Sequence, residues 1–171
     1  GEIVNAIQNL SKLLRVSISD EKQEVPLKQE MEYIRQYLSL QNIVTGGKLS
    51  WDFYVEQGAE QVLVPKLILQ PIVENSMIHG FEHNWENPMI VITAQKQGEA
   101  LLLEVCDNGQ GIQQDFLDRI LEEDEPEKVK RNRAHIGIKN IQKRIQILYG
   151  KEYGMKMESS PGNGMIVKLR L

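Results

Sequence analysis

The sequence has 171 residues, of which 41% are hydrophobic and 26% charged, so the chain is long enough to bury one substantial core. Its net charge is −4 and its lysines and arginines are scattered, which argues against binding to a nucleic-acid backbone. The single cysteine, Cys106, excludes an internal disulfide framework, and the sequence has neither a signal peptide nor an apolar run of the ~18 residues that a membrane span needs. Because Gly1 opens directly onto a helical pattern, we expect a soluble piece cut from a longer protein.

The first part of the chain predicts two amphipathic helices. Apolar residues recur at steps of three and four over residues 3–16 and again over residues 27–38, where Pro26 suits the first helical turn. Gly46 and Gly47 end this pattern, and residues 49–55 then alternate between apolar and polar as a half-buried strand does. We therefore place a domain boundary near Gly46.

The second part predicts a mixture of strands and helices. Pro65 is expected to open a helix that ends near Gly80 and is bent at Pro71, and strands at 89–94 and 100–106 form a hairpin. A charged stretch at 113–133 holds a short helix at 116–121, and it is followed by a helix over 138–148 and strands at 155–159 and 165–171. Paired strands and fewer helices indicate an α/β architecture in which one helical layer covers a mixed sheet.

The segment Leu69–Gly80 places polar residues on a predicted helix. Asn75 and His79 lie four residues apart and share a helical face, with Glu74 beside them. An amide oxygen is a natural ligand for Mg²⁺, and a neighbouring carboxylate can hold a metal-bound water or accept a proton. The alternative is an ordinary helix end with polar surface residues.

Asp107-Asn-Gly-Gln-Gly111 follows an apolar strand. The Asp107 carboxylate can accept a hydrogen bond from an exocyclic amine, and Gly109 and Gly111 allow the backbone to approach a flat ligand closely. A simple turn is the alternative, because Asp-Asn-Gly is common in turns.

The segment His135–Asn140 lies where a basic stretch becomes a helix. A helix N-terminus offers free N–H groups and the positive end of a dipole to a phosphate, and Lys139 adds a charge. The alternative is a flexible loop-to-helix junction around Gly137.

In this order on one chain, the three segments resemble the N, G1 and G2 boxes of the ATP-binding domain shared by histidine kinases, Hsp90, MutL and type II topoisomerases. The strings VPLKQEMEYIRQYLSLQNI, LQPIVENSMIHG and IGIKNIQKRIQILYG resemble the YesM/LytS type of sensor histidine kinase, and the resemblance covers essentially the whole chain. It implies a two-layer α/β sandwich with a mixed sheet and a helical layer, the Bergerat-type ATP-binding fold, preceded by two helices. Residues 1–45 would be the end of the dimerisation and phosphoacceptor helix plus a connecting helix, and residues 46–171 the ATP-binding catalytic domain.

The resemblance also assigns roles to individual residues. Asn75 matches the Mg²⁺-coordinating asparagine, Glu74 the catalytic acidic residue beside it, and Asp107 the aspartate that reads the adenine amino group of ATP. Residues 113–133 correspond to the mobile ATP lid. The other implied nucleotide-binding residues are His79, Gly109, Gly111, Ile112, His135, Gly137, Ile138, Lys139 and Gly164.

Three positions depart from the family pattern. Many relatives have lysine in place of Ile78, glycine in place of His135 and threonine in place of Met165, which weakens the expected contacts on the phosphate side. No string like NPHFLYN occurs, so no histidine of this chain is expected to be the phosphoacceptor.

The implied activity is transfer of the γ-phosphoryl of Mg-ATP to a histidine outside this chain. Its implied partners are the phosphoacceptor histidine domain of the same full-length protein, a second copy in a homodimer, and a response regulator. The fragment would be cytoplasmic and the full-length protein anchored in the bacterial cell membrane. One alternative is a nucleotide-responsive interaction module without phosphotransfer. Another is a serine kinase of the anti-sigma type, which the two leading helices disfavour.

Overall fold

The computed structural model describes residues 23–81, 86–121 and 133–171, and for residues 116, 119–121 and 133–139 it describes the backbone alone. The helix predicted over residues 3–16 and the middle of the predicted lid lie outside the described residues.

The main sheet has five strands and mixed direction. β2 and β4 are parallel, because the chain crosses over through a helix between them, and every other neighbouring pair is antiparallel. The hairpin predicted on either side of residue 98 is confirmed as β4 and β5. In spatial order the strands are β2 (Ser50–Val55), β4 (Met89–Gln97), β5 (Ala100–Asp107), β7 (Met165–Arg170) and β6 (Gly154–Ser159).

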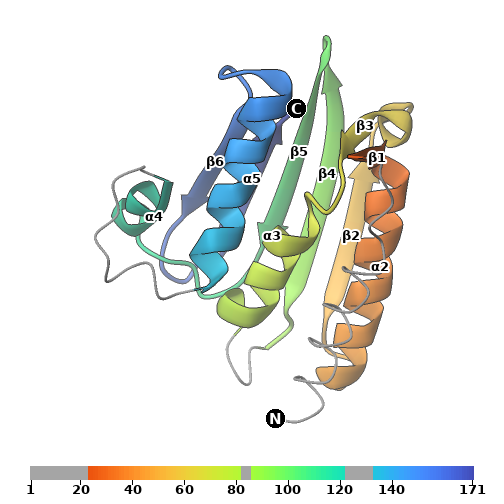
Figure 1. The fold of residues 1–171 in the computed structure, drawn as a ribbon. Coiled ribbons are helices and arrows are strands. Elements are labelled where there is room, and N and C mark those ends of the chain that lie inside the picture. Colours follow the sequence, from red (N-terminus) through yellow and green to blue (C-terminus); the bar gives the residue numbers. More distant parts are fainter. Residues whose placement is uncertain (1–22, 82–85, 122–132) are drawn as a thin grey trace.

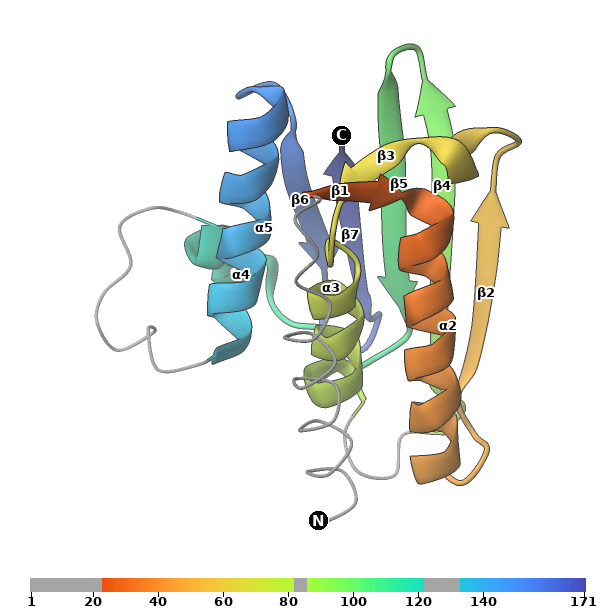
Figure 2. The ribbon, with the colours of Figure 1, turned by 45° about the vertical axis from the view of Figure 1, so that its right-hand side comes forward.

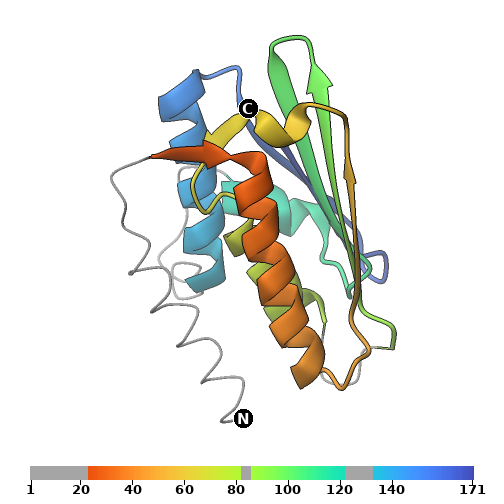
Figure 3. The ribbon, with the colours of Figure 1, turned by 90° about the vertical axis from the view of Figure 1, so that its right-hand side faces the viewer.

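Three helices form a layer on one face of this sheet (Figure 1). They are α2 (Leu27–Val44), α3 (Gln70–Asn75) and α5 (Arg133–Tyr149). Turning the molecule shows the helices side by side in front of the strands (Figure 2), and the view from the side separates the two layers (Figure 3). The short helix α4 (Gln114–Leu121) lies near β6 at the edge of the sheet. The predicted two-layer α/β sandwich is confirmed.

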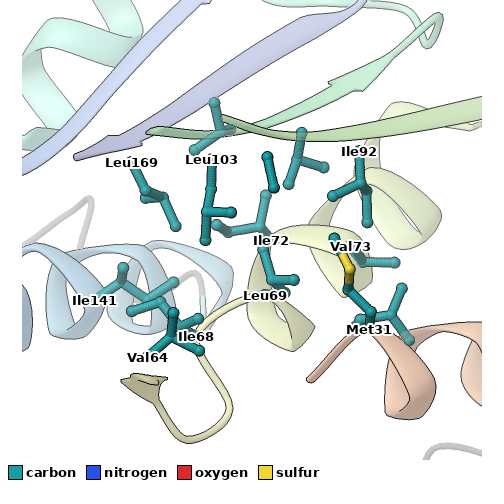
Figure 4. Close-up of a cluster of buried hydrophobic side chains, with 14 of the residues drawn as sticks. Met31, Val64, Ile68, Leu69, Ile72, Val73, Ile92, Leu103, Ile141 and Leu169 are labelled. Atoms are coloured by element: carbon teal, nitrogen blue, oxygen red, sulfur yellow. The ribbon is translucent and has the colours of Figure 1, made fainter. Parts of the chain in front are cut away.

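The core fills the space between the two layers. Strand residues such as Ile92, Leu103 and Leu169 point toward helix residues such as Met31 and Ile72, and all of these side chains are buried (Figure 4). Every second strand residue is buried because successive side chains point to opposite faces of a sheet. The apolar stripe of α2 belongs to this same core, so α2 packs on the sheet directly. The domain boundary proposed near residue 46 stays a prediction.

A second, two-stranded sheet lies near the N-terminal ends of α2 and α3 (Figure 2) and was not predicted. β1 (Glu24–Pro26) pairs antiparallel with β3 (Leu63–Pro65), and a short 3-10 helix, η1 (Ala59–Gln61), precedes β3. These strands have three residues each, so no alternation could reveal them in the sequence. Their pairing joins the segment that leads into α2 to the segment that leads into α3.

The helix predicted to begin at Pro65 begins later than expected. Pro65 ends β3, a turn follows, and α3 starts at Gln70, so Pro71 lies in the first helical turn and does not bend the helix. Leu67 has φ +60, a left-handed backbone conformation that no helix can contain. After Asn75 the helix widens into the π-helical turn η2 (Ser76–Gly80).

Candidate functional site

The site is built around Asp107, the last residue of β5. The Asp107 carboxylate accepts three hydrogen bonds from three different segments. Oδ2 accepts from the hydroxyl of Ser76 at 2.6 Å, while Oδ1 accepts from the backbone N–H of Gly109 at 2.9 Å and from that of Met165 at 3.2 Å. The end of β5, the start of β7 and the π-helical turn η2 therefore meet at one carboxylate.

Burial and hydrogen bonding act on Asp107 in opposite directions. Burial raises the pKa of the Asp107 carboxyl, and the hydrogen bonds from Ser76, Gly109 and Met165 oppose that rise. Because a carboxylate has about four lone-pair directions and three are used, Asp107 has room for one more donor. A half-buried acceptor with spare capacity is suited to accepting a hydrogen bond from an N–H group of a ligand.

Glycines allow the surrounding backbone segments to approach one another. A Cβ added to Gly109 would lie 2.5 Å from the carbonyl oxygen of Gly80, and one added to Gly164 would overlap the carbonyl oxygen of Asp107. Gly111 and Gly164 also have positive φ, +63 and +69, which glycine adopts most readily. These two positions therefore require glycine for the backbone itself.

The loop after β5 is tied to the strands and to η2 by further hydrogen bonds. The backbone N–H of Gln110 donates to the carbonyl of Gly80 at 2.8 Å, and its side chain donates to the carbonyl of His79 at 2.7 Å. The N–H of Ile112 donates to the hydroxyl of Ser159 at 3.0 Å, and that hydroxyl donates to the carbonyl of Gly164 at 2.5 Å. The segment 107–111, predicted from the sequence as either a turn or a ligand contact, is thus hydrogen-bonded to η2 and, through Ile112, to the strands.

Glu74, Asn75 and His79 lie on the helical segment that faces this loop. Glu74 and Asn75 are half-buried at the end of α3, and Glu74 accepts a hydrogen bond from the side chain of Gln70 at 2.8 Å. His79 is exposed on η2, and the neighbouring Ile78 is 51% exposed. The structure brings this segment to Asp107 through Ser76, the residue directly after Asn75.

The third predicted segment lies within a helix. α5 begins at Arg133, so His135, Gly137, Ile138 and Lys139 belong to its first turns rather than to a loop that precedes it. Their side chains are not described, and their contacts with a nucleotide stay a prediction. The expected helix start near residue 138 was wrong by about one turn.

Sequence reasoning missed two residues of the site, Ser76 and Ser159. Ser76 is 3% exposed, and Ser159 links the loop after β5 to the start of β7. Its place beside Asn75 in a helical segment that carries several polar residues was the only signal for the first. Nothing in the strand pattern pointed to the second.

Two family models match this chain. The model described as "Histidine kinase" matches residues 1–49, and the model described as "Histidine kinase-, DNA gyrase B-, and HSP90-like ATPase" matches residues 63–171, more than half of the chain. The chain belongs to the histidine kinase-, DNA gyrase B- and HSP90-like ATPase family. The model that matches residues 1–49 agrees with the predicted resemblance to histidine kinases, and Asp107, Gly109 and Gly164 lie inside the range that the second model matches.

The similar curated proteins are sensor histidine kinases. YesM of Bacillus subtilis is 29% identical over 95% of this chain, BtsS of Escherichia coli 27% over 96%, and HptS of Staphylococcus aureus 27% over 94%. The chain spans only 26%, 27% and 30% of these proteins, respectively. It is therefore comparable with about a quarter of a sensor kinase.

Solved structures confirm the fold. The histidine kinase domain of the Erythrobacter litoralis EL346 blue-light-activated kinase superposes with a TM-score of 0.59 at 19% identity, covering 88% of this chain and 68% of that one. The catalytic domain of the histidine kinase ThkA gives a TM-score of 0.59 at 19% identity, covering 86% of this chain and 94% of that one.

Two kinds of feature are absent from the part of the chain that the structure describes. None of the described helices is long and apolar enough to cross a membrane. Within the described ranges, no group of three or more His, Cys, Asp or Glu side chains is arranged to hold a metal ion.

Proposed function

We propose that this chain binds Mg-ATP and transfers its γ-phosphoryl group to a histidine that lies outside the chain. The observation that carries the proposal is the half-buried Asp107 carboxylate at the end of β5, held by three donors and still able to accept a fourth. The 6-amino group of adenine is such a donor. Close backbone packing at Gly109 and Gly164 supports the same interpretation, because it holds the segments around Asp107 against one another.

The donor set near Asn75 fits a magnesium ion that is held mainly by the nucleotide. Mg²⁺ usually binds one or two protein oxygens together with phosphate oxygens and water, and Asn75 offers one amide oxygen at the end of α3. Such an ion would neutralise charge on the phosphates during transfer. We assign Asn75 to metal coordination.

Glu74 is the candidate to orient the incoming histidine. Its carboxylate is half-buried, and the hydrogen bond from Gln70 restrains it within the helix. A restrained carboxylate can accept the N–H of an imidazole and so direct the other ring nitrogen at the phosphoryl group. Glu74 would thus orient the phosphoacceptor histidine, while Asp107 would bind the adenine base.

The remaining assignments also belong to this proposal. Residues 113–133 would form the lid over the phosphates, with His79, Gly111, Ile112, His135, Gly137, Ile138 and Lys139 as further nucleotide contacts. The partners would be the phosphoacceptor domain of the same protein, a second copy of that protein and a response regulator. We also propose that the full-length protein is anchored in the membrane, as a sensor.

The first experiment is calorimetric titration of ATP and ADP into the chain, with and without Mg²⁺. Asp107→Asn should weaken ADP binding about 10- to 100-fold, because a hydrogen bond to a charged, half-buried group is lost. Asp52→Asn, an exposed aspartate on β2, is the matched control and should bind normally. If wild type and Asp107→Asn bind ADP with equal affinity, adenine does not bind at Asp107.

The metal and transfer steps need separate tests. Asn75→Ala should abolish the dependence of ATP affinity on Mg²⁺, while Gln36→Ala, which removes an exposed amide from α2, should not. Labelled ATP and a fragment bearing the acceptor histidine should then give acid-labile phosphoprotein. Tight ATP binding without transfer would favour the nucleotide-responsive interaction module instead.

A further inference from the structure

Ser76 makes the shortest hydrogen bond to the Asp107 carboxylate, which is proposed above to bind the adenine base. Its hydroxyl lies 2.6 Å from Oδ2 of Asp107, and its only other acceptor among the described residues is the carbonyl of Ile72 at 3.5 Å. An O–H to carboxylate hydrogen bond of this length is charge-assisted and strong. The single proton of Ser76 is therefore donated to Asp107.

The surroundings of Asp107 oppose a proton on either of its oxygens. A proton on Oδ1 would face the N–H groups of Gly109 and Met165, which are themselves donors. A proton on Oδ2 would have to compete with the hydroxyl proton of Ser76. Of these donors, only the Ser76 hydroxyl at Oδ2 belongs to a side chain.

We propose that Ser76 is a positioning residue that keeps Asp107 a pure acceptor, and that it thereby makes the site select 6-amino purines over 6-oxo purines. An ionised Asp107 attracts the amino group of adenine and repels the 6-oxo oxygen of hypoxanthine or guanine. A protonated Asp107 could instead donate to that oxygen. This inference rests on the proposed function, since it assumes that Asp107 faces the base.

The geometry gives Ser76 this role rather than a general packing role. Ser76 is 3% exposed within η2, one residue after Asn75, so little solvent reaches its hydroxyl. Met165 contributes to Asp107 through its backbone alone, so among the described contacts Ser76 is the only side chain that donates to this carboxylate. Burial raises the pKa of Asp107, and the hydrogen bond from Ser76 is the largest of the effects that oppose the rise.

The test compares ADP with inosine diphosphate, which carries an oxo group in place of the 6-amino group. Calorimetric titrations are run from pH 5.5 to 8 on wild type, Ser76→Ala and Ser76→Thr. Ser76→Ala should weaken ADP binding about three- to tenfold. It should also lower the ratio of ADP affinity to IDP affinity, and this decrease should grow as the pH falls. Ser76→Thr keeps the hydroxyl and should restore the ratio.

Two further variants separate positioning from packing. Ser39→Ala on α2 removes a hydroxyl that donates to the carbonyl four residues earlier, at 2.8 Å. This substitution should change the affinity for neither ADP nor IDP. Asp107→Asn can donate to a 6-oxo group, so its preference should shift toward IDP, and adding Ser76→Ala to it should change the ratio no further. Equal weakening of ADP and IDP by Ser76→Ala at every pH would overturn the inference.

A nucleotide-free measurement keeps the two proposals distinguishable. The carboxyl carbon of Asp107 is titrated by NMR in wild type and Ser76→Ala, and its pKa should be higher in the variant. If wild type binds neither nucleotide, the proposed function fails. The NMR titration still decides whether Ser76 stabilises the ionised form of Asp107. An unchanged Asp107 pKa would show that Ser76 does not.

Discussion

Glu30 of α2 holds the backbone of Leu67, 37 residues away, in the turn that precedes α3. Its Oε1 accepts the N–H of Leu67 at 2.7 Å and its Oε2 accepts the N–H of Ile68 at 3.0 Å, while the Glu30 side chain is only 1% exposed. This turn contains the left-handed conformation of Leu67, so the glutamate offsets a local strain. The position of α3, and with it the position of Asn75 and Ser76, depends on that contact.

We expect Glu30→Ala to lower the free energy of unfolding by about 2 to 4 kcal/mol, because the N–H groups of Leu67 and Ile68 lose a buried acceptor. Urea denaturation followed by circular dichroism measures the loss. Glu32→Ala is the control: Glu32 is exposed on the same helix, and its ion pair with Arg35 at 3.7 Å should contribute less than about 1 kcal/mol. Equal effects of the two substitutions would show that the turn does not depend on Glu30.

Burial raises the pKa of Glu30 above its ordinary value, and this gives folding stability a defined dependence on pH. The hydrogen bonds from residues 67–69 and the charge of Arg144 oppose the rise but do not cancel it. A raised pKa means that the folded protein binds the proton more tightly than the unfolded chain does. The contribution of Glu30 to stability should therefore increase as the pH falls from above the folded-state pKa toward the ordinary value.

The comparison with Glu30→Gln isolates this effect, because glutamine does not titrate. The free energy of unfolding of wild type minus that of Glu30→Gln should rise as the pH falls from 7 to 4.5. Urea titrations at four pH values measure the difference. A difference that is flat or that falls with falling pH would contradict the direction of the pKa shift.

Gly164 and Gly98 have nearly the same backbone conformation and opposite surroundings. Their φ angles are +69 and +65, but a Cβ on Gly164 would overlap the carbonyl oxygen of Asp107, whereas nothing lies within 4 Å of one on Gly98. Gly98→Ala should lower stability by about 1 kcal/mol, from backbone strain alone. Gly164→Ala should lower it by at least about 2 kcal/mol more and weaken ADP binding. Equal losses of stability would mean that close approach at Asp107 is not required.

Arg144 of α5 links this helix to the two segments that lead into α2 and α3. Its guanidinium donates to the carbonyl of Lys66 at 2.5 Å and to that of Gln23 at 3.1 Å. Arg144→Ala should lower the free energy of unfolding by about 1 to 3 kcal/mol. Arg144→Lys should restore little of this loss, because a single ammonium group cannot donate to both carbonyls as the two guanidinium nitrogens do. Lys143→Ala, at an exposed position next to it, should be nearly neutral in the same denaturation experiment.

Sequence patterns predicted most of the regular structure, because those patterns are local. The apolar run that predicted a strand at 100–106 and the alternation that predicted one at 165–171 agree with β5 and β7, and the stripe over 27–38 agrees with the buried face of α2. The prediction failed between Pro65 and Gln70, where a proline next to apolar residues favoured a helix. A turn forms there because Glu30 satisfies its N–H groups, and no local rule can include a residue so distant in the sequence.

By itself the sequence determined that Asp107 ends an apolar strand, that glycines follow it, and that Asn75 lies in a polar helical segment, because each feature involves neighbouring residues. Only the tertiary structure decided that Ser76 donates to Asp107 across 31 positions and that β7 lies between β5 and β6. These relationships depend on how the two layers pack around one core. Packing between segments far apart in the chain has no period and no fixed spacing, so it leaves no pattern in a single sequence.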